Sequence, residues 1–464
     1  MLNNHWAVAR GFDCLCKEII MTDREKLYAE KLATMVQCNT VSEENNENVE
    51  KFEHFHEVLA QLFPNVFSKC EVVKIGQALL LKLKGKEPYQ GQGEPIVLMS
   101  HQDVVPATGK WQHEPFSGDI DENGIIWGRG TMDTKCSLMC IFQALEETIQ
   151  EGYEPNVDVY IASSCNEELS GYGAPKTVKY LQEKGVHLQL LIDEGGMIVT
   201  NPMAGVKGQF AMIGTLEKGH GNIVITAHSN GGHASTPKKG SPIARLSAFV
   251  DEIEKHDPNK PKMNSTMQEM LRRFAPYTSG ALGFVFKHIK FFTPLLEKVL
   301  PKINASAGAM IKTTMAFTMC GGSNAANVLP EKAWLNINTR FIQHQGIEET
   351  RKILEPLCKK YNLEMGFVNP RAPQKPVDFT EEGFKLVESV VKEVYSNVHP
   401  TPYVMTGGTD AYFYWPITDN AIRFAPLVIT DQQLKSIHGI DENIAASSLP
   451  SGVDFYKAVI RRVK

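Results

Sequence analysis

The sequence predicts an α/β protein, in which a mixed, mostly parallel sheet carries helices on both faces and a second, smaller α+β domain is inserted. Three observations support this fold class. Strand-like runs alternate with helical runs up to about residue 205, which is typical of a parallel sheet. The pattern then changes to strands with one apolar face. At 464 residues, the chain also exceeds the size at which a single core keeps growing.

The first domain begins with helical runs over residues 23–62, where apolar residues recur three and four apart. The runs "ALLLKLKG", "PIVLMSHQDVV", "VDVYIASS" and "LQLLIDEGG" predict strands because they are short, apolar and rich in branched residues. Between them, "CSLMCIFQALEETIQEG" and "APKTVKYLQEKG" have helical periodicity, and the first should end near Gly152. These runs alternate as they do in a layered α/β domain.

The inserted domain is recognised by strands that alternate between apolar and polar residues, as half-buried antiparallel strands do. In "GNIVITAHS" the apolar positions are Ile223, Ile225 and Ala227, and "KAWLNINTRFIQ" alternates in the same way. A helical stretch over residues 263–312 separates the two. We therefore predict a first domain over residues 1–206 and 346–464, and an inserted domain over residues 207–345.

Composition and charge exclude several classes of protein. A net charge of −5 and a pI near 6.3 argue against binding to nucleic acid or to an anionic membrane. The nine cysteines follow neither a zinc-knuckle nor a disulfide spacing. The first twenty residues do not resemble a signal peptide. The most apolar stretch, "GALGFVFKHIKFFTPLLEKVL", is interrupted by Lys287, Lys290 and Pro294. We expect a cytoplasmic protein.

Acidic and imidazole side chains follow several predicted strands, at the edge where open α/β sheets bind their ligands. The residues are His101 and Asp103 after the second strand, Glu167 and Glu168 after the third, Asp193 and Glu194 after the fourth, Asp133 before the long helix, and His438 near the C-terminus. Taken singly, each has a structural explanation: Asp133 is a good helix N-cap, and Asp193-Glu194-Gly195-Gly196 is good turn chemistry. Their coincidence instead indicates the ligand set that zinc and similar ions prefer.

Five such ligands, with one carboxylate shared, are what two neighbouring metal ions require. Asp103 has a use that needs no metal contact, because its carboxylate can accept the second ring N–H of His101 and fix its tautomer.

The chain also contains a series of motifs that resembles the M20 metallopeptidase family, nearest to its carboxypeptidase S and aminoacylase branch. The motifs, in the family's order, are "SHQDVVP", "PFSGDIDENGIIWGRGTMDTK", "NEELSGYGA", "DEGG", "GGHASTP", "NVLP", "TGGTDA" and "IHGIDE". They span most of the chain. This series is specific for the family and says little about the substrate.

The resemblance implies a role for each matching residue. His101 and Asp193 would hold one metal, Glu168 and His438 the other, and Asp133 would bridge them. Glu194 is adjacent to Asp193, and the family uses either type of acid at this ligand position. Zinc is the expected metal, and cobalt or manganese would also suit these ligands. Glu167 would be the general base: it would take a proton from a water between the metals, and the hydroxide would attack an amide carbonyl.

Four further residues match positions of the family that act on the substrate, one of them catalytic (His233) and three of them substrate-binding (Asn327, Arg340 and Gly408). His233 in "GGHASTP" would stabilise the oxyanion, often in the neighbouring subunit's site, so the inserted domain would act as a lid and as the contact surface of a homodimer. Arg340 and Asn327 would grip the substrate's carboxylate, and backbone at Gly408 would complete that pocket. Without the family, His233 is as easily a turn residue and Arg340 a solvated one.

Three positions near the predicted metals depart from the family pattern, namely Gln102, Cys136 and Asn166, and none of them removes a ligand. We therefore predict a metal-dependent hydrolase that cleaves small peptides with a free carboxylate. An N-acyl-amino-acid deacylase, of the aminoacylase or desuccinylase type, is the alternative. A non-catalytic metal- or peptide-binding protein is a third reading, against which the complete set of ligands and Glu167 argues.

Overall fold

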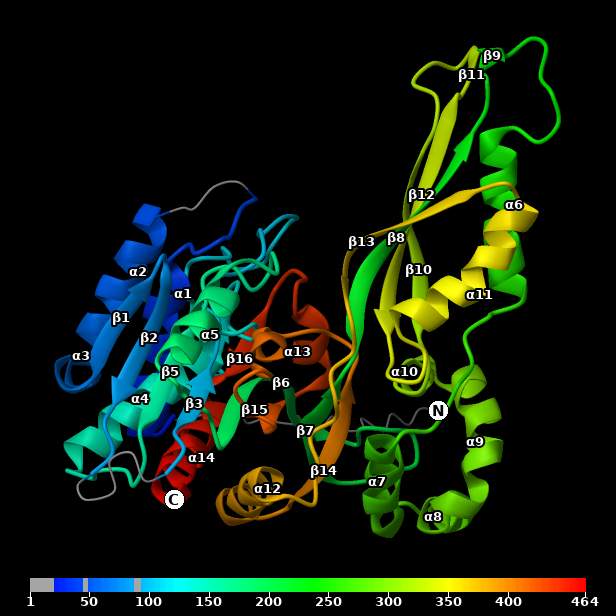
Figure 1. The fold of residues 1–464 in the computed structure, drawn as a ribbon. Helices are drawn as coiled ribbons and strands as arrows, with labels where there is room; N and C mark the ends of the chain where they lie inside the picture. Colours follow the sequence, from blue (N-terminus) through cyan, green and yellow to red (C-terminus); the bar gives the residue numbers. More distant parts are fainter. Residues whose placement is uncertain (1–20, 45–48, 87–92) are drawn as a thin grey trace, which may run out of the picture.

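The computed structural model describes residues 21–44, 49–86 and 93–464. The N-terminal stretch in which we predict no signal peptide lies outside these residues. The described part of the chain forms two larger sheets, and Figure 1 shows that they stand side by side, with the smaller one extending away from the larger.

The larger sheet has eight strands in the described residues, and its centre is parallel. In spatial order the strands are β1 (Glu71–Ile75), β2 (Ala78–Leu83), β5 (Val159–Ser163), β3 (Ile96–Met99), β6 (Leu190–Thr200), β15 (Ala421–Ile429), β7 (Gln209–Glu217) and β14 (Val398–Met405). The pairs β5–β3, β3–β6, β6–β15 and β7–β14 are parallel, and the pairs at β1–β2 and β2–β5 are antiparallel. The predicted mixed, mostly parallel sheet is confirmed.

Helices cover both faces of this sheet because successive strand residues point to opposite sides. Leu98 and Ile161 face a core made with α1 (Asp23–Gln37), α4 (Lys135–Gln150), α12 (Glu382–Val394) and α14 (Leu449–Arg462). Val97 and Ala162 face a second core made with α5 (Gly173–Glu183). The remaining elements of this part are α2 (Val49–Leu62), α3 (Pro64–Lys69), α13 (Asp431–Ser436) and the two-stranded pair β4 (Ile125–Trp127) with β16 (Asn443–Ala445).

The smaller sheet is antiparallel and has one apolar face. Its order is β10 (Thr314–Gly321), β12 (Lys332–Phe341), β8 (Gly219–His228) and β13 (Glu364–Arg371). Ile223, Ile225 and Ile337 pack against α6 (Pro242–Lys255) and α11 (Ile347–Lys360). The opposite face carries Asn222 and Asn338, whose side chains hydrogen-bond each other. At one end of this sheet, β9 (Gly232–His233) pairs with β11 (Val328–Leu329).

The sequence predicts one helical stretch over residues 263–312, and the structure divides it into four helices. They are α7 (Ser265–Phe274), α8 (Gly280–Lys287), α9 (Ile289–Ile303) and α10 (Ala305–Ala309). Gly280 has φ +69°, a conformation that favours glycine and marks the start of α8. These helices pack on β7 and β14 of the larger sheet, through Phe210, Met212 and Val404.

The strands of the smaller sheet do not begin and end where we predict the inserted domain, at residues 207 and 345. β7 belongs to the larger sheet, and it is almost uniformly buried, so it lacks the alternation that marks the inserted strands. α11 and β13 belong to the smaller sheet, and β13 is a largely exposed edge strand with a weak apolar pattern. We propose that the inserted domain extends from about residue 218 to about residue 372. Among the described helices, none combines the length and apolar character that crossing a bilayer requires.

Candidate metal centre

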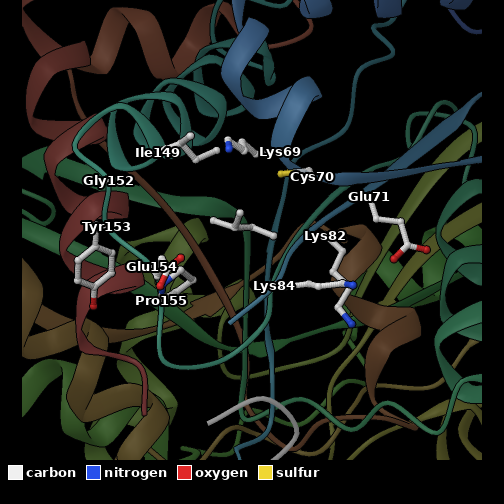
Figure 2. A pocket seen from close by; sticks show the side chains of 11 residues that line it. Lys69, Cys70, Glu71, Lys82, Lys84, Ile149, Gly152, Tyr153, Glu154 and Pro155 are labelled. Carbon is white, nitrogen blue, oxygen red and sulfur yellow. The ribbon is translucent and has the colours of Figure 1, made fainter. Parts of the chain in front are cut away.

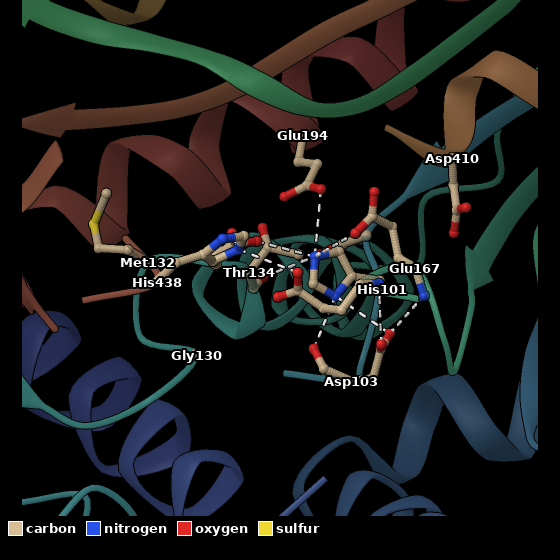
Figure 3. A network of polar contacts seen from close by, with 12 residues as sticks. His101, Asp103, Gly130, Met132, Thr134, Glu167, Glu194, Asp410 and His438 are labelled. Atoms are coloured by element: carbon tan, nitrogen blue, oxygen red, sulfur yellow. Dashed lines mark hydrogen bonds and ion pairs between the residues drawn. The ribbon is translucent and has the colours of Figure 1, made fainter. Parts of the chain in front are cut away.

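Most of the residues that the sequence predicts near the metals converge at the carboxyl ends of the central parallel strands (Figure 3). His101 follows β3, Glu167 and Glu168 follow β5, and Glu194 lies within β6. Asp133 comes two residues before α4, and His438 follows α13. The chain thus brings side chains from five separate segments to one edge of the sheet, as a parallel arrangement favours.

Two groups of ligand atoms form around the carboxylate of Asp133. One group consists of His101, Asp133 and Glu194, and the other of Asp133, Glu168 and His438; within each, the ligand atoms all lie within 4.8 Å of one another. Nε2 of His101 is 3.0 Å from Oδ1 of Asp133, and Nε2 of His438 is 2.9 Å from Oδ2. The two oxygens of Asp133 therefore face two different imidazoles, which is the geometry of a bridging carboxylate.

The hydrogen bond made by Nδ1 of His101 directs Nε2 toward Asp133 and Glu194. Its Nδ1 donates to the backbone carbonyl of Asp103 at 2.8 Å, and the carboxylate of Asp103 is farther away, at 3.5 Å. The expected orientation of His101 thus comes mainly from main chain. The Asp103 carboxylate instead accepts the backbone N–H groups of Glu167 and Glu168, at 3.0 and 3.2 Å, and so fixes the pair of acids.

Glu194, and not the predicted ligand Asp193, has its carboxylate beside His101 in the structure. Both oxygens of Asp193 are engaged, because they accept the backbone N–H groups of Glu194 and Ala411, each at 2.8 Å. Oε1 of Glu194 lies 3.3 Å from Nε2 of His101. The strand places adjacent residues on opposite sides, so only one of the two acids can face His101.

Glu442, which the sequence reasoning missed, organises the loop that presents Asp133. Its carboxylate is fully buried and accepts the backbone N–H groups of Gly130, Met132 and Asp133, at 3.1, 2.7 and 3.0 Å. It also pairs with Arg129 at 2.6 Å. An acid four residues after His438 in "IHGIDE" was the available signal, but spacing alone does not reveal a contact with a loop three hundred residues earlier in the chain.

Glu442→Gln is expected to weaken metal binding by about 10- to 100-fold, because a positioning partner of a ligand is lost. The amide keeps the size of the side chain but cannot accept all four hydrogen bonds as a carboxylate does. Chelator competition measures the affinity, and thermal unfolding measures the structural cost. Glu114→Gln, at an exposed loop position, is the matched control. Unchanged metal affinity in Glu442→Gln would contradict the assigned role.

The buried, closely spaced carboxylates of the metal centre shift the pKa values of its acids and imidazoles. Burial raises the pKa of the Glu194 carboxyl to about 8, and Asp133 adds to this rise while His101 opposes it. Burial also raises the pKa of Glu167 well above its ordinary value. Hydrogen bonds to Asp133 and Glu168 raise the pKa of His438 to about 10. A divalent cation relieves the mutual repulsion of such carboxylates more fully than protons do.

An unpartnered carboxylate oxygen is a second feature of the site that suits a bound divalent metal ion. Oε1 of Glu168 is buried and has no hydrogen-bond partner in the parts of the chain that the structure describes. An uncompensated carboxylate oxygen of this kind is costly in a protein interior. Together with the imidazole nitrogens and the shared carboxylate, it fits a pair of ions of the zinc type.

The four predicted substrate-binding residues fall in two places. Arg340 and Gly408 lie together near the junction of the two sheets, because His220 is the register partner of Arg340 and its ring approaches Gly408. His233 and Asn327 are exposed and lie beside β9 and β11, which stand at the far end of the smaller sheet (Figure 1). The single chain therefore does not bring His233 or Asn327 to the metal centre.

Asp410, in the quoted motif "TGGTDA", is a second buried acid that the predictions did not include. Ser164 donates to its carboxylate, and burial together with nearby carboxylates raises its pKa to about 7. Figure 3 places Asp410 close to Glu167. It therefore contributes negative charge behind the predicted general base.

The three residues that depart from the family pattern make their side-chain hydrogen bonds to groups outside the metal centre. Gln102 contacts His56 and the backbone of Gln77, and Cys136 donates to the backbone of Met132. Asn166 caps the backbone N–H of Gly173. These side chains support the surrounding loops.

A separate pocket of about 530 Å³ contains none of the predicted site residues. It is lined by Lys69, Lys82, Lys84 and Glu154 among others (Figure 2). Lys82 is already paired with Asp158 at 2.6 Å. We assign the chemistry to the convergent strand ends and not to this pocket.

This fold and this group of side chains define a metal-dependent hydrolase, and residues 97–462 match the family described as peptidase family M20/M25/M40. The chain belongs to that family. It is 30% identical over 457 residues to the N-fatty-acyl-amino acid synthase/hydrolase PM20D1 of Xenopus tropicalis, covering 97% of this chain and 88% of that protein. It is 31% identical over 448 residues to a probable carboxypeptidase S-like 2 of Dictyostelium discoideum, covering 94% and 85%.

Solved structures agree on the fold. The M20 family metallo-carboxypeptidase Sso-CP2 of Sulfolobus solfataricus superposes with a TM-score of 0.68 at 16% identity, over 95% of this chain and 99% of that one. The YXEP protein of Bacillus subtilis, described as a dinuclear metal-binding peptidase of the M20 family, superposes with a TM-score of 0.56 at 14% identity, over 94% and 98%. The predicted family, fold class and hydrolase activity are confirmed.

Proposed function

We propose that the enzyme binds two divalent metal ions and hydrolyses the amide bond next to a free carboxylate, in small peptides with a free C-terminus. The observation that carries the proposal is the sharing of Asp133 between the His101–Glu194 group and the Glu168–His438 group. Zinc suits these nitrogen and carboxylate donors best, and cobalt or manganese would also fit.

Bound ions of this kind supply an activated water and polarise the amide carbonyl. Glu167 stands beside the two groups, with Oε2 4.0 Å from Nε2 of His101, and its side chain makes no hydrogen bond with the described residues. It is therefore free to take a proton from water and deliver it to the leaving amine. Asp103 holds the backbone of Glu167 and Glu168, so that the base and the ligand keep their separate directions.

The substrate carboxylate has a cationic site at the junction of the two sheets. His220 is the register partner of both Arg340 and Arg371, so the three side chains share one face of the smaller sheet. Burial and the two guanidinium groups lower the pKa of His220 to about 4, which keeps it neutral at pH 7. Arg371 also donates to the backbone carbonyl of Ser170, close to the Glu167–Glu168 turn. A carboxylate bound to Arg340 would lie near Gly408, because His220 neighbours both.

Hydrolysis of a substrate panel by zinc- or cobalt-loaded enzyme tests the proposal. Substrates with a free carboxylate should be preferred over their amides, and Arg340→Ala should raise KM for the acids by about 10- to 100-fold while changing the amides little. Lys332→Ala, at an exposed position of the same strand, is the control. Equal turnover of acids and amides by the wild type would reject the carboxylate site, and a protein that binds no metal would reject the whole assignment.

N-acyl amino acids are the second candidate substrates, because they also present an amide next to a carboxylate. The similarity to a protein named N-fatty-acyl-amino acid synthase/hydrolase favours them specifically. The similarity to a carboxypeptidase S-like protein is of the same size, so identity does not separate the two classes. Dipeptides compared with N-acetyl, N-succinyl and N-oleoyl amino acids in one panel would separate them.

We also propose a homodimer formed by the smaller sheet, in which His233 and Asn327 complete the partner's site. Support comes from the edge strand β10 and from a groove of about 720 Å³ between β10 and α6, lined by Ile243, Leu246, Val250, Met319 and Trp334. Ile243 is 51% exposed and Met319 is 61% exposed, which is typical of a surface that a partner covers.

Mixing two inactive variants tests the shared site. Glu167→Gln and His233→Ala, unfolded and refolded together, should recover about a quarter of wild-type activity, since half of the randomly formed dimers are mixed and each has one intact site. Each variant refolded alone is the control. Mixed dimers that form, as shown by differently tagged chains, yet stay inactive would contradict the exchange of His233.

A further inference from the structure

Helices α8 and α9 expose a continuous apolar surface that the proposed function does not use. Phe284 is 59% exposed, Phe291 81% and Leu295 54%. The ring of Phe292 lies between the other two rings, with centroids 6.1 Å from Phe284 and 5.1 Å from Phe291. Leu295 is one helical turn after Phe291, on the same side of α9. We call these four residues the α8–α9 patch.

The outward direction of the patch is fixed by packing on the opposite side of the same helices. Phe286, Ile289, Leu296 and Leu300 are buried in the core that these helices share with β7 and β14. The helices therefore cannot turn the patch inward without exposing an equal or larger apolar surface. Exposed aromatic clusters of this kind mark interaction surfaces.

The charge around the patch is opposite to that of the whole chain. Residues 280–303 contain four lysines and one acid, whereas the net charge of the protein is −5. The lysines are Lys287, Lys290, Lys298 and Lys302; all four are exposed, and none has an ion-pair partner within the described residues. The acid, Glu297, accepts the backbone N–H of Met263. The ammonium groups are thus available to an anionic partner.

We propose that the α8–α9 patch binds an anionic lipid surface. Phenyl rings and a leucine flanked by lysines are typical of helices that lie in a membrane interface, where the rings enter the acyl boundary and the ammonium groups meet phosphates. Lys298 and Lys302 follow Phe291 and Leu295 by seven residues, so cationic and apolar side chains share one stripe of α9. A dry protein interface would bury these ammonium groups, and lysine is depleted at such interfaces.

This inference does not rest on the proposed function. Figure 1 shows α8 and α9 at the outer edge of the molecule, on the far side of α7 from α12. The proposed lipid binding changes our expectation that the protein would not bind membranes. That expectation rested on the charge of the whole chain. The lysines are concentrated locally, and at physiological ionic strength charges act over only about 8 Å.

Co-sedimentation of the full-length chain with lipid vesicles tests the proposal. Wild-type protein should bind vesicles of phosphatidylcholine with phosphatidylserine at least about tenfold more strongly than vesicles of phosphatidylcholine alone. Phe291→Ser with Leu295→Ser should lose about tenfold in binding to the anionic vesicles. Lys290→Glu with Lys298→Glu should lose the preference for anionic lipid. Leu27→Ser, at a position 46% exposed on α1, and Lys352→Glu, exposed on α11, are the matched controls.

Three outcomes would overturn the proposal. The first is that wild-type protein binds neither type of vesicle, and the second is that patch and control variants bind equally well. The third is that Phe291→Ser with Leu295→Ser changes the molecular mass in solution and not vesicle binding, which would make the patch a protein interface. The lysine variants alter only exposed groups, so they test the proposal even if the double serine variant fails to fold.

Discussion

Replacing Glu167 by glutamine is expected to lower kcat by about 10²- to 10⁴-fold, the usual contribution of a general base. The amide cannot accept a proton, yet it has the size of the carboxylate. Metal content should stay at two ions per chain, because Glu167 belongs to neither group of ligands. The fold should also survive, because the hydrogen bond that fixes residue 167 runs from its backbone N–H to Asp103.

Single-turnover kinetics with metal analysis on the same sample would measure both quantities. Glu154→Gln, at an exposed position, is the control for a lost acid. If turnover fell only because metal was lost, Glu167 would be a ligand and not the base. If turnover were unchanged, the proton would have to leave by another group, and the mechanism proposed for this site would be wrong.

The second large effect is expected from Glu194, and it distinguishes the two adjacent acids of "DEGG". Glu194→Gln should weaken the affinity of one metal by more than about 100-fold, because a neutral amide oxygen replaces a charged ligand. Asp193→Asn should have a smaller effect, within about 10- to 100-fold, because Asp193 accepts hydrogen bonds from main chain and only supports the strand end.

Titration of the metal-free protein with zinc, against a competing chelator, would give both affinities. The two variants serve as controls for each other, since they remove one charge at neighbouring positions. A larger loss in Asp193→Asn than in Glu194→Gln would restore the first assignment and would require a rearrangement of β6 when metal binds.

Much of the centre was predictable because parallel strands bring distant residues together by a simple rule. His101, Asp133, Glu168 and His438 meet as expected, each in a loop or at a strand end. The choice between Asp193 and Glu194 was not predictable from pattern, because it depends on which of two alternating side chains of one strand faces His101. The role of Glu442 depends on a contact between loops three hundred residues apart.

The boundaries of the inserted domain were harder to predict than the metal centre. The alternating strands β8 and β12 were evident from their period of two, but the uniformly buried β7 and the largely exposed β13 gave no such signal. Arg340 lies beside His220 because of the register between β12 and β8. The hydrophobic pattern alone does not fix the register of two strands that are so far apart in the sequence. The proposed role of His233 requires a second chain, which no feature of one chain can position.

The bonds made by Glu442 have a consequence for when the enzyme becomes active. His438 and Glu442 come from the last part of the chain, yet Glu442 holds the loop of Asp133, whose carboxylate both ligand groups share. A growing chain on the ribosome therefore has no complete centre until residue 442 has been made. We therefore expect hydrolytic activity only after the segments that carry Asp133, His438 and Glu442 have all been made.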